Sequence, residues 1–470
     1  MLNEMLILMR QELALIVLIL LLLLMKLGKD RSNDSLLGFI HLALLINLLV
    51  GFLFFERGGF LFGDMFNSAP FLTVFKSILN LALLLISLQS HAWLSKHDHL
   101  IEFYVLLLTS LLGMNLMISS GNMLLFYLGL EMSTIPAAAA ANFELRKRNS
   151  SEAAFKLIIS SAFSSGLLLM GISFFYGATG SLNIDEASHF VTNEPLQILS
   201  FILVLAGLGF KISAVPFHWW TADVYEGSPV AVTSFLSVVS KSAAVFVLVS
   251  FLFRIYYAIG EVWTIALSVL AVVTILIGNL FALRQDNIKR LLAFSSIAQV
   301  GFILVAVISG SVQAVTAVVF FLLIYVFSNL AAFGIVSVIS FATGKEKVSD
   351  YAGLSRSNPM LAWILAIALF SLAGIPPTAG FFAKFFLLME GASTGNFGVV
   401  GFAAANMVIS FYYYLKLVKL MFMDEGDDSI GKISVAWESK LALFLCTAGI
   451  LITGVAGVVY DSLFALISGN

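Results

Sequence analysis

The chain has 470 residues, of which 60% are hydrophobic and only 11% are charged, and its formal net charge is −2 at neutral pH. Soluble globular domains carry about 25% charged residues, so this composition excludes a soluble enzyme or binding module. A net charge near zero gives no indication of a nucleic-acid partner. The single cysteine, Cys446, excludes an intramolecular disulfide and a cysteine-ligated cluster.

Apolar segments long enough to cross about 30 Å of hydrocarbon as helices recur along the whole chain. We therefore predict an all-α polytopic membrane protein, embedded in the lipid bilayer, with about fourteen transmembrane helices. The predicted spans are 5–27, 36–55, 70–94, 100–119, 121–142, 151–176, 197–225, 229–253, 260–283, 287–309, 312–341, 360–391, 397–422 and 439–466.

The charge of the connecting segments predicts the orientation of the chain. Odd-numbered spans are followed by cationic segments such as "KLGKDR", "ELRKR" and "LRQDNIKR", whereas the segments after even-numbered spans are almost free of lysine and arginine. Arg57 and Arg254 are the exceptions. Because cationic loops stay cytoplasmic, we expect both termini on the outer side of the membrane.

Two stretches of the chain follow the same plan. A proline break at Pro216, in the seventh span, recurs 160 residues later at Pro376 and Pro377, in the twelfth span. The second unit begins five spans after the first. Because five is an odd number, the second unit enters the membrane from the opposite side. Inverted repeats with broken helices in matching positions indicate a transport site near the middle of the membrane. We divide the chain into an N-terminal unit (1–99), a first five-helix repeat (100–253), a second, inverted repeat (254–422) and a C-terminal helix (423–470).

Four charged residues lie deep inside predicted spans, namely Glu131, Lys211, Lys241 and Lys384. A charge at the centre of a bilayer costs about 2.5–3.5 kcal/mol even on insertion scales, so these groups have to face the bundle interior, pair with one another or contact water. A proline break frees backbone groups and so marks a cavity. Burial disfavours a charged lysine and a nearby carboxylate favours it. We therefore predict that these residues translocate protons and that Glu131 forms a salt bridge with Lys211.

Other polar residues leave alternatives open. Lys76 and Lys156 lie near the starts of their spans, which favours snorkelling to the interface. His218 follows the first break and can either hydrogen-bond to the unwound backbone or carry protons. Glu102 and Glu144 lie at cytoplasmic ends of spans, as a proton entrance or, as we favour, as solvated helix ends.

The sequence indicates no metal or cofactor site. The segment "KHDH" at 96–99 offers two histidines, but we interpret it as a solvated loop rather than a metal site. No nucleotide-binding, haem or catalytic-triad motif is present in the sequence.

The segments around the buried charges resemble a known family. "GLGFKISAVPFHWWTADVYEGSPVAVTSFLSVVSKSAAVF", "RQDNIKRLLAFSSIAQVGF" and "SLAGIPPTAGFFAKFFLL" are similar to the antiporter-like membrane subunits of respiratory complex I, from about residue 100 to 422. Within this family the chain resembles the type that ends soon after its last span. That type has a lysine at the position of Lys384, where another member typically has a glutamate.

The resemblance implies a function. It implies a proton-translocating subunit of a bacterial NADH:quinone oxidoreductase in the inner membrane, beside another antiporter-like subunit and small membrane subunits. It also implies that Glu131 and Lys211 act as a pair, that Lys241 relays the proton and that Lys384 lies near the exit. NADH, FMN, iron–sulfur clusters and quinone are then expected on partner subunits, with no redox centre in this chain.

Two other functions stay open. A subunit of a stand-alone, multi-subunit cation/proton antiporter shares the expected fold, although the length of the chain and Lys384 fit it less well. A membrane scaffold without transport does not account for the central charges.

Overall fold

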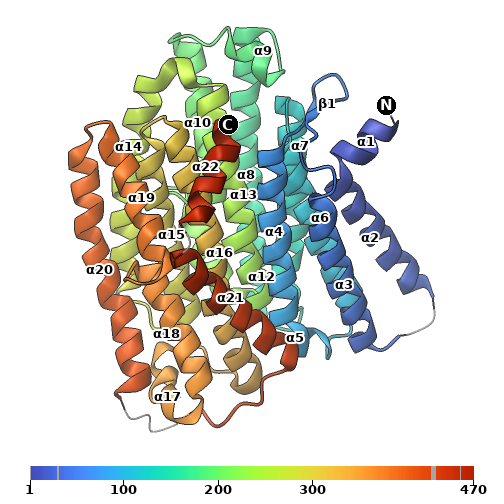
Figure 1. Cartoon of the computed structure of the whole chain (residues 1–470), viewed down its shortest axis with the longest axis vertical. Helices are drawn as coiled ribbons and strands as arrows, with labels where there is room; N and C mark the ends of the chain where they lie inside the picture. Colours follow the sequence, from blue (N-terminus) through green and yellow to red (C-terminus); the bar gives the residue numbers. More distant parts are fainter. Residues whose placement is uncertain (1, 29–30, 425–429, 456, 470) are drawn as a thin grey trace.

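Long helices build nearly the whole molecule. The computed structural model describes residues 2–28, 31–424, 430–455 and 457–469. The helices stand roughly side by side in a bundle, with α2 and α3 at one edge and α20 at the other (Figure 1). The α-helices are α1 (Leu2–Leu8), α2 (Arg10–Leu27), α3 (Asn33–Gly51), α4 (Pro70–Gln89), α5 (His91–Leu94), α6 (Leu100–Ile118), α7 (Met123–Ala141), α8 (Arg148–Thr179), α9 (Ile184–Ser188), α10 (Pro195–Ile212), α11 (Trp219–Gly227), α12 (Val230–Ser234), α13 (Lys241–Arg254), α14 (Gly260–Ala282), α15 (Ile288–Val307), α16 (Val312–Thr343), α17 (Leu354–Ser357), α18 (Pro359–Ala373), α19 (Ala379–Ser393), α20 (Phe397–Phe422), α21 (Trp437–Val455) and α22 (Val458–Ser468). A π-helix, η1 (Phe235–Ser240), joins α12 to α13, and η2 (Tyr257–Ile259) and η3 (Val348–Tyr351) are 3₁₀ turns.

The helices make this chain a multi-pass membrane protein. In the described part of the chain, twelve helices are long and apolar enough to cross a membrane, or thirteen if α1 and α2, bent by 88°, form one span. The predicted total of about fourteen is not confirmed. The predicted span at 360–391 consists of α18 and α19, which have 15 residues each and are shorter than the ~20 residues of a usual span.

One small hairpin departs from the all-α prediction. β1 (Gly59–Leu61) pairs antiparallel with β2 (Phe66–Ser68) in the connection after α3. The backbone N–H of Asn67 donates to the carbonyl of Ser119 over 2.7 Å, which ties the hairpin to the end of α6. Strands of three residues are too short to show the alternation that predicts strands.

The ends of the bundle agree with the predicted alternation of loops. α1 and α22 lie toward the same end as the hairpin and α9, whereas α5 and α17 lie toward the opposite end (Figure 1). The hairpin and α9 belong to connections after even-numbered predicted spans, α17 belongs to a connection after an odd-numbered one, and α5 forms the end of the predicted third span. Which end faces outward stays a prediction.

The two predicted repeats share their order of elements. In each, two helices precede a 32-residue helix, which is α8 in the first and α16 in the second, and a broken helix follows. The second helix of each unit begins at an asparagine cap, Asn122 or Asn287. Both caps form an isolated bridge to the segment after the long helix, at Asn183 and Lys347 respectively. These matching details favour the predicted division of the chain, which stays a prediction.

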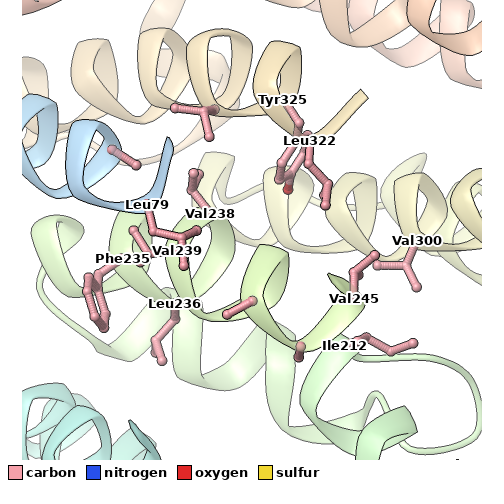
Figure 2. Packing of buried hydrophobic residues seen from close by; sticks show 14 of the residues in the cluster. Leu79, Ile212, Phe235, Leu236, Val238, Val239, Val245, Val300, Leu322 and Tyr325 are labelled. Atoms are coloured by element: carbon pink, nitrogen blue, oxygen red, sulfur yellow. The ribbon is translucent and has the colours of Figure 1, made fainter. Parts of the chain in front are cut away.

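The centre of the molecule lies around α13, α15 and α16, together with α12. In each of the spans that these helices form, 89–94% of the 18-residue apolar stretch is buried within the protein. Figure 2 shows side chains of α4 (Leu79), η1 (Val238), α15 (Val300) and α16 (Leu322) in this packed region. Polar residues on these helices are therefore shielded from lipid and have to find partners inside the protein.

Candidate proton-transfer site

The first helix break lies between α10 and α11. α10 ends at Ile212, Ser213 takes a left-handed conformation (φ 65°), and α11 begins at Trp219. Protein groups satisfy the freed backbone: the indole N–H of Trp220 donates to the carbonyl of Phe210 over 3.1 Å, and the N–H of Val215 donates to Thr274 of α14 over 3.0 Å. The break is thus held closed by side chains from both predicted repeats.

His218 lies against the unwound segment that it follows. It is buried and has a backbone hydrogen-bond contact with Pro216, which agrees with the expected contact to the unwound backbone. Its Nδ1 atom has no hydrogen-bond partner in the part of the chain that the structure describes. A proton-carrying role for His218 stays open.

Lys211 stands on the last turn of α10 and points at α7. Its ammonium donates to the hydroxyls of Ser133 (3.1 Å) and Thr134 (2.5 Å). The predicted salt bridge with Glu131 is not formed in this conformation, since no ion pair joins the two among the described residues, and Glu131 Oε1 has no hydrogen-bond partner there. The pairing in another conformation stays a prediction.

A narrow cavity connects Glu131 to Lys211. Both residues line it, together with Thr134 of α7 and the serine-rich face of α8 that includes Ser161 and Ser164. The space open to the centre of a water molecule is about 10 Å³, close to what one water needs. The geometry therefore suits a contact between the carboxylate and the ammonium through one water molecule.

Lys241 follows directly after the π-helix η1, in the centre of the bundle. It is buried, and its ammonium donates to the Ser296 hydroxyl of α15 over 2.8 Å and lies 5.7 Å from the centre of the Tyr225 ring. π-Helical turns are rare and occur frequently at functional sites. Close by, Asn329 of α16 donates to Tyr325 over 2.8 Å and to Ser237 of η1 over 3.2 Å. Lys241 thus belongs to a polar cluster inside an apolar core.

Lys384 stands on α19 and reaches back across the second break. Its ammonium donates to the carbonyls of Leu372 (2.7 Å) and Ala373 (3.1 Å) at the end of α18. The break at Pro376 leaves these carbonyls without helical donors, and the C-terminal end of a helix attracts a cation. The carbonyls that end the first half of the broken helix thereby bind the cation that its second half carries.

Sequence reasoning missed the polar side chains of α15 that lie between these lysines. Ser295 and Tyr414 are hydrogen-bonded to each other, Ser296 accepts from Lys241, and Gln299 donates to the carbonyl of Leu372 over 3.0 Å. A signal was present in "AFSSIAQVGF", where three polar residues interrupt an apolar run. Periodicity does not tell which helix such residues will face.

Lys76 is not a snorkelling residue, so that prediction is wrong. Its side chain is 2% exposed, and its ammonium lies 2.6 Å from the carboxylate of Glu12, which is 1% exposed. Lys156 is partly exposed and pairs with Asp223 (2.6 Å) and Glu152 (2.8 Å). Asp223 also pairs with Arg290 of α15 over 2.7 Å.

Glu102 and Glu144 each form an ion pair, the first exposed and the second partly buried. Glu102 pairs with Lys26, and Glu144 pairs with Lys147 over 2.7 Å. Glu144 also lines a surface cavity of about 520 Å³ that includes Glu226 of α11. The proton-entrance and the solvated-end interpretations both stay open.

The histidine loop has its own internal contacts. The ring of His97 lies 4.7 Å from that of Phe143, and its Nδ1 accepts from the backbone N–H of His99 over 3.2 Å. Burial and the neighbouring His99 lower the pKa of His97 below its ordinary value. No group of three or more His, Cys, Asp or Glu residues suited to a metal ion occurs in the described ranges.

Known proteins are similar to this chain over the part that holds the four predicted site residues. A family model described as "NADH:quinone oxidoreductase/Mrp antiporter, TM" matches residues 120–410. The chain is 45% identical to a protein of Phocaeicola vulgatus over 86% of both chains, and 37% identical to one of Desulforamulus reducens over 94% of both; each is named NADH-quinone oxidoreductase subunit N.

Solved structures show the same fold. A chain of respiratory complex I from Thermus thermophilus is 32% identical, with a TM-score of 0.83, over 96% of this chain and 99% of that chain. A chain of the Mrp complex from a Dietzia species gives a TM-score of 0.89 at 20% identity, over 100% of this chain and 98% of that one. The second likeness is one of fold alone.

Proposed function

Because this chain belongs to the family of membrane subunits shared by NADH:quinone oxidoreductases and Mrp antiporters, we propose that it is the subunit N of a bacterial respiratory complex I and translocates protons. Electron transfer from NADH to quinone takes place on partner subunits, which carry the flavin, the clusters and the quinone. This chain lies in the inner membrane, with both termini outward, beside another antiporter-like subunit and small membrane subunits.

One observation supports this function above all others. Lys211, Lys241 and Lys384 are buried, yet within the described ranges each donates only to hydroxyls or backbone carbonyls. A buried lysine without a paired carboxylate can give up its proton and leave no bare charge behind. Three such lysines in one bundle form a set of sites that can load and release protons in turn.

The four predicted residues take different parts in this function. Glu131 and Lys211, linked through the narrow cavity, control loading at the first break. Lys241 receives the proton in the centre, and Lys384 at the second break passes it toward the outer side. The repeats 100–253 and 254–422 supply one break each.

The stand-alone cation/proton antiporter is the second candidate. It is favoured only by the likeness in fold to the Mrp complex, at 20% identity, whereas identity to proteins named subunit N reaches 45%. Purification of the tagged chain from native membranes separates the two candidates. Peripheral flavin and iron–sulfur subunits are expected to co-purify, and recovery of small membrane subunits alone would favour the antiporter.

Proton uptake by inverted membrane vesicles tests the lysines. We expect Lys241→Met to leave NADH oxidation by an artificial acceptor unchanged and to abolish NADH-driven, quinone-dependent proton uptake. Lys26→Gln, which removes an exposed cation paired with Glu102, is the matched control and should pump normally. Normal pumping by Lys241→Met would contradict the proposal.

A further inference from the structure

Gln299 occupies a position between the central lysine and the exit lysine. It lies on α15 three residues after Ser296, whose hydroxyl accepts from Lys241. Its side chain is 2% exposed, in a helix that is buried on all sides. A carboxamide in such a place has to be satisfied by the protein itself.

The amide N–H of Gln299 and the ammonium of Lys384 share one acceptor. Gln299 Nε2 donates to the carbonyl of Leu372 over 3.0 Å, and Lys384 Nζ donates to the same oxygen over 2.7 Å. A carbonyl oxygen has two lone pairs, so it can accept both donors together. Gln299 Nε2 also lies 3.4 Å from the hydroxyl of Tyr414.

The other atom of the carboxamide is free to accept. Gln299 Oε1 is buried and has no hydrogen-bond partner within the described part of the chain. Buried polar atoms in native proteins nearly always have a partner, so an unpaired acceptor in this position requires an explanation. It lies in the region that a proton has to cross between Lys241 and Lys384.

We infer that Gln299 is a positioning residue for proton transfer from Lys241 to Lys384. This inference rests on the proposed function. When Lys384 is a neutral amine and leaves the end of α18, Gln299 still satisfies the carbonyl of Leu372, so the break keeps its shape while the lysine moves. The transferred proton leaves the Lys241 ammonium, passes through a water molecule and ends on the Lys384 amine. Gln299 stays neutral throughout, and its Oε1 accepts a hydrogen bond from that water molecule.

The first break differs in this respect. The indole N–H of Trp220 and the backbone N–H of Ser213 both donate to the carbonyl of Phe210, near the end of α10, while Lys211 is turned toward α7. At the second break, by contrast, the carbonyl of Leu372 accepts from both Gln299 and Lys384. Gln299 therefore keeps this carbonyl paired when the lysine changes its contacts.

The test compares two buried glutamines in the assembled complex. Gln299→Met keeps length and bulk but removes the donor, and we expect the rate of NADH-driven proton uptake to fall about tenfold, the factor given by one lost hydrogen bond. Gln89→Met is the matched control, because Gln89 Nε2 also donates to a backbone carbonyl, that of Leu330, over 3.0 Å. This control should lose the same amount of thermal stability and pump normally.

A conservative variant separates positioning from mere packing. Gln299→His keeps an N–H donor of similar reach, and we expect it to restore most of the proton uptake. Normal pumping by Gln299→Met would overturn the inference. So would a loss that is equal in the Gln89→Met variant and is not rescued by histidine.

The inference and the proposed function can fail separately. If Lys241→Met pumps normally, the relay itself is wrong. If Lys241→Met loses pumping while Gln299→Met does not, the relay stands and only the role of Gln299 is wrong.

Discussion

The partners of the buried lysines divide them into two kinds. Lys76 lies 2.6 Å from Glu12, so a carboxylate matches its charge. Lys241 donates to a hydroxyl and Lys384 donates to backbone carbonyls. Removing a proton from Lys76 would leave an unmatched carboxylate in an apolar interior, which is strongly unfavourable. Burial alone therefore does not identify a proton carrier, whereas the chemistry of the partner does.

A carrier has to lose its proton, and arginine does not do so. Guanidinium stays charged in proteins, so we expect Lys384→Arg to assemble and to oxidise NADH with an artificial acceptor, yet to lose proton uptake into inverted vesicles. Lys416→Arg, on the exposed face of α20, is the control and should behave like the unmodified protein. Full pumping by Lys384→Arg would remove Lys384 from the pathway.

The carboxylate of Glu131 is expected to matter through its charge. Glu131→Gln keeps the size of the side chain in the narrow cavity and removes the charge that favours an ammonium on Lys211. We expect the rate of proton uptake to fall more than tenfold, as one charge-assisted contact accounts for roughly 1.5–3 kcal/mol. The same substitution at Glu186, an exposed residue of α9, is the control. Equal uptake by both variants would contradict a role for Glu131.

Among the elements, the second break depends on a very close approach of α19 to α18. A Cβ atom on Gly380 would lie 1.8 Å from the carbonyl oxygen of Ser371. Gly380→Ala therefore has to push the two half-helices apart and displace Lys384 from the end of α18. We expect a loss of roughly 1–3 kcal/mol, measured as a lower melting temperature of the purified complex, together with reduced pumping.

A second glycine provides the comparison for this prediction. A Cβ atom on Gly401, in α20, would meet no atom within 4 Å. Gly401→Ala should leave pumping unchanged and stabilise the helix by up to about 1 kcal/mol. If Gly380→Ala were as stable and as active as Gly401→Ala, the close approach would not be needed.

The ion pair between α2 and α4 holds the N-terminal helices together. Glu12→Ala leaves Lys76 buried and unpaired, and we expect it to lower stability by about 3–5 kcal/mol. The double substitution Glu12→Leu with Lys76→Met removes both charges and should restore most of that stability. The stability of both variants is measured by heating the complex and monitoring the loss of this subunit from the membrane arm. If the double variant were no more stable than Glu12→Ala, the stabilising effect of the pair would not be explained by each buried charge neutralising the other.

Local patterns predicted the elements better than the contacts between them. Hydropathy located the helices, and the matching prolines located both breaks, because each signal lies within one stretch of sequence. The total of fourteen spans was not confirmed. The predicted span at 360–391 is divided into α18 and α19, and neither of these is long enough to cross a membrane by itself. The hairpin at 59–68 was missed because its strands have three residues each.

The site was predictable in its charges and not in their partners. Glu131, Lys211, Lys241 and Lys384 were conspicuous because charged groups are costly in lipid. The partner of Lys76 is 64 residues away in the sequence, and Gln299 meets Leu372 across 73 residues. Such contacts depend on the packing of whole helices, which no local pattern encodes.

For the whole molecule, the distribution of charge on the loops gives a test of topology. We expect the segment 146–148 to be cytoplasmic and the C-terminus to be outward, because cationic loops are retained inside. A periplasm-dependent reporter fused to the C-terminus should be active, and the same reporter inserted at 147 should be silent. The reverse pattern would invert the bundle and with it the proposed direction of proton movement.

The ion pairs of Arg290 join α11 to α15. Asp223 lies on α11, the half-helix after the first break, and is paired with Arg290 on α15 over 2.7 Å, while Glu226, one turn further on α11, pairs with the same Arg290 over 2.8 Å. α15 carries the acceptor for Lys241 and the amide beside Lys384. Two ion pairs therefore tie the half-helix after the first break to the helix that contacts Lys241 and shares an acceptor with Lys384. In the proposed relay, any displacement of α11 would be transmitted through Arg290 to α15, so the three lysine sites would change together.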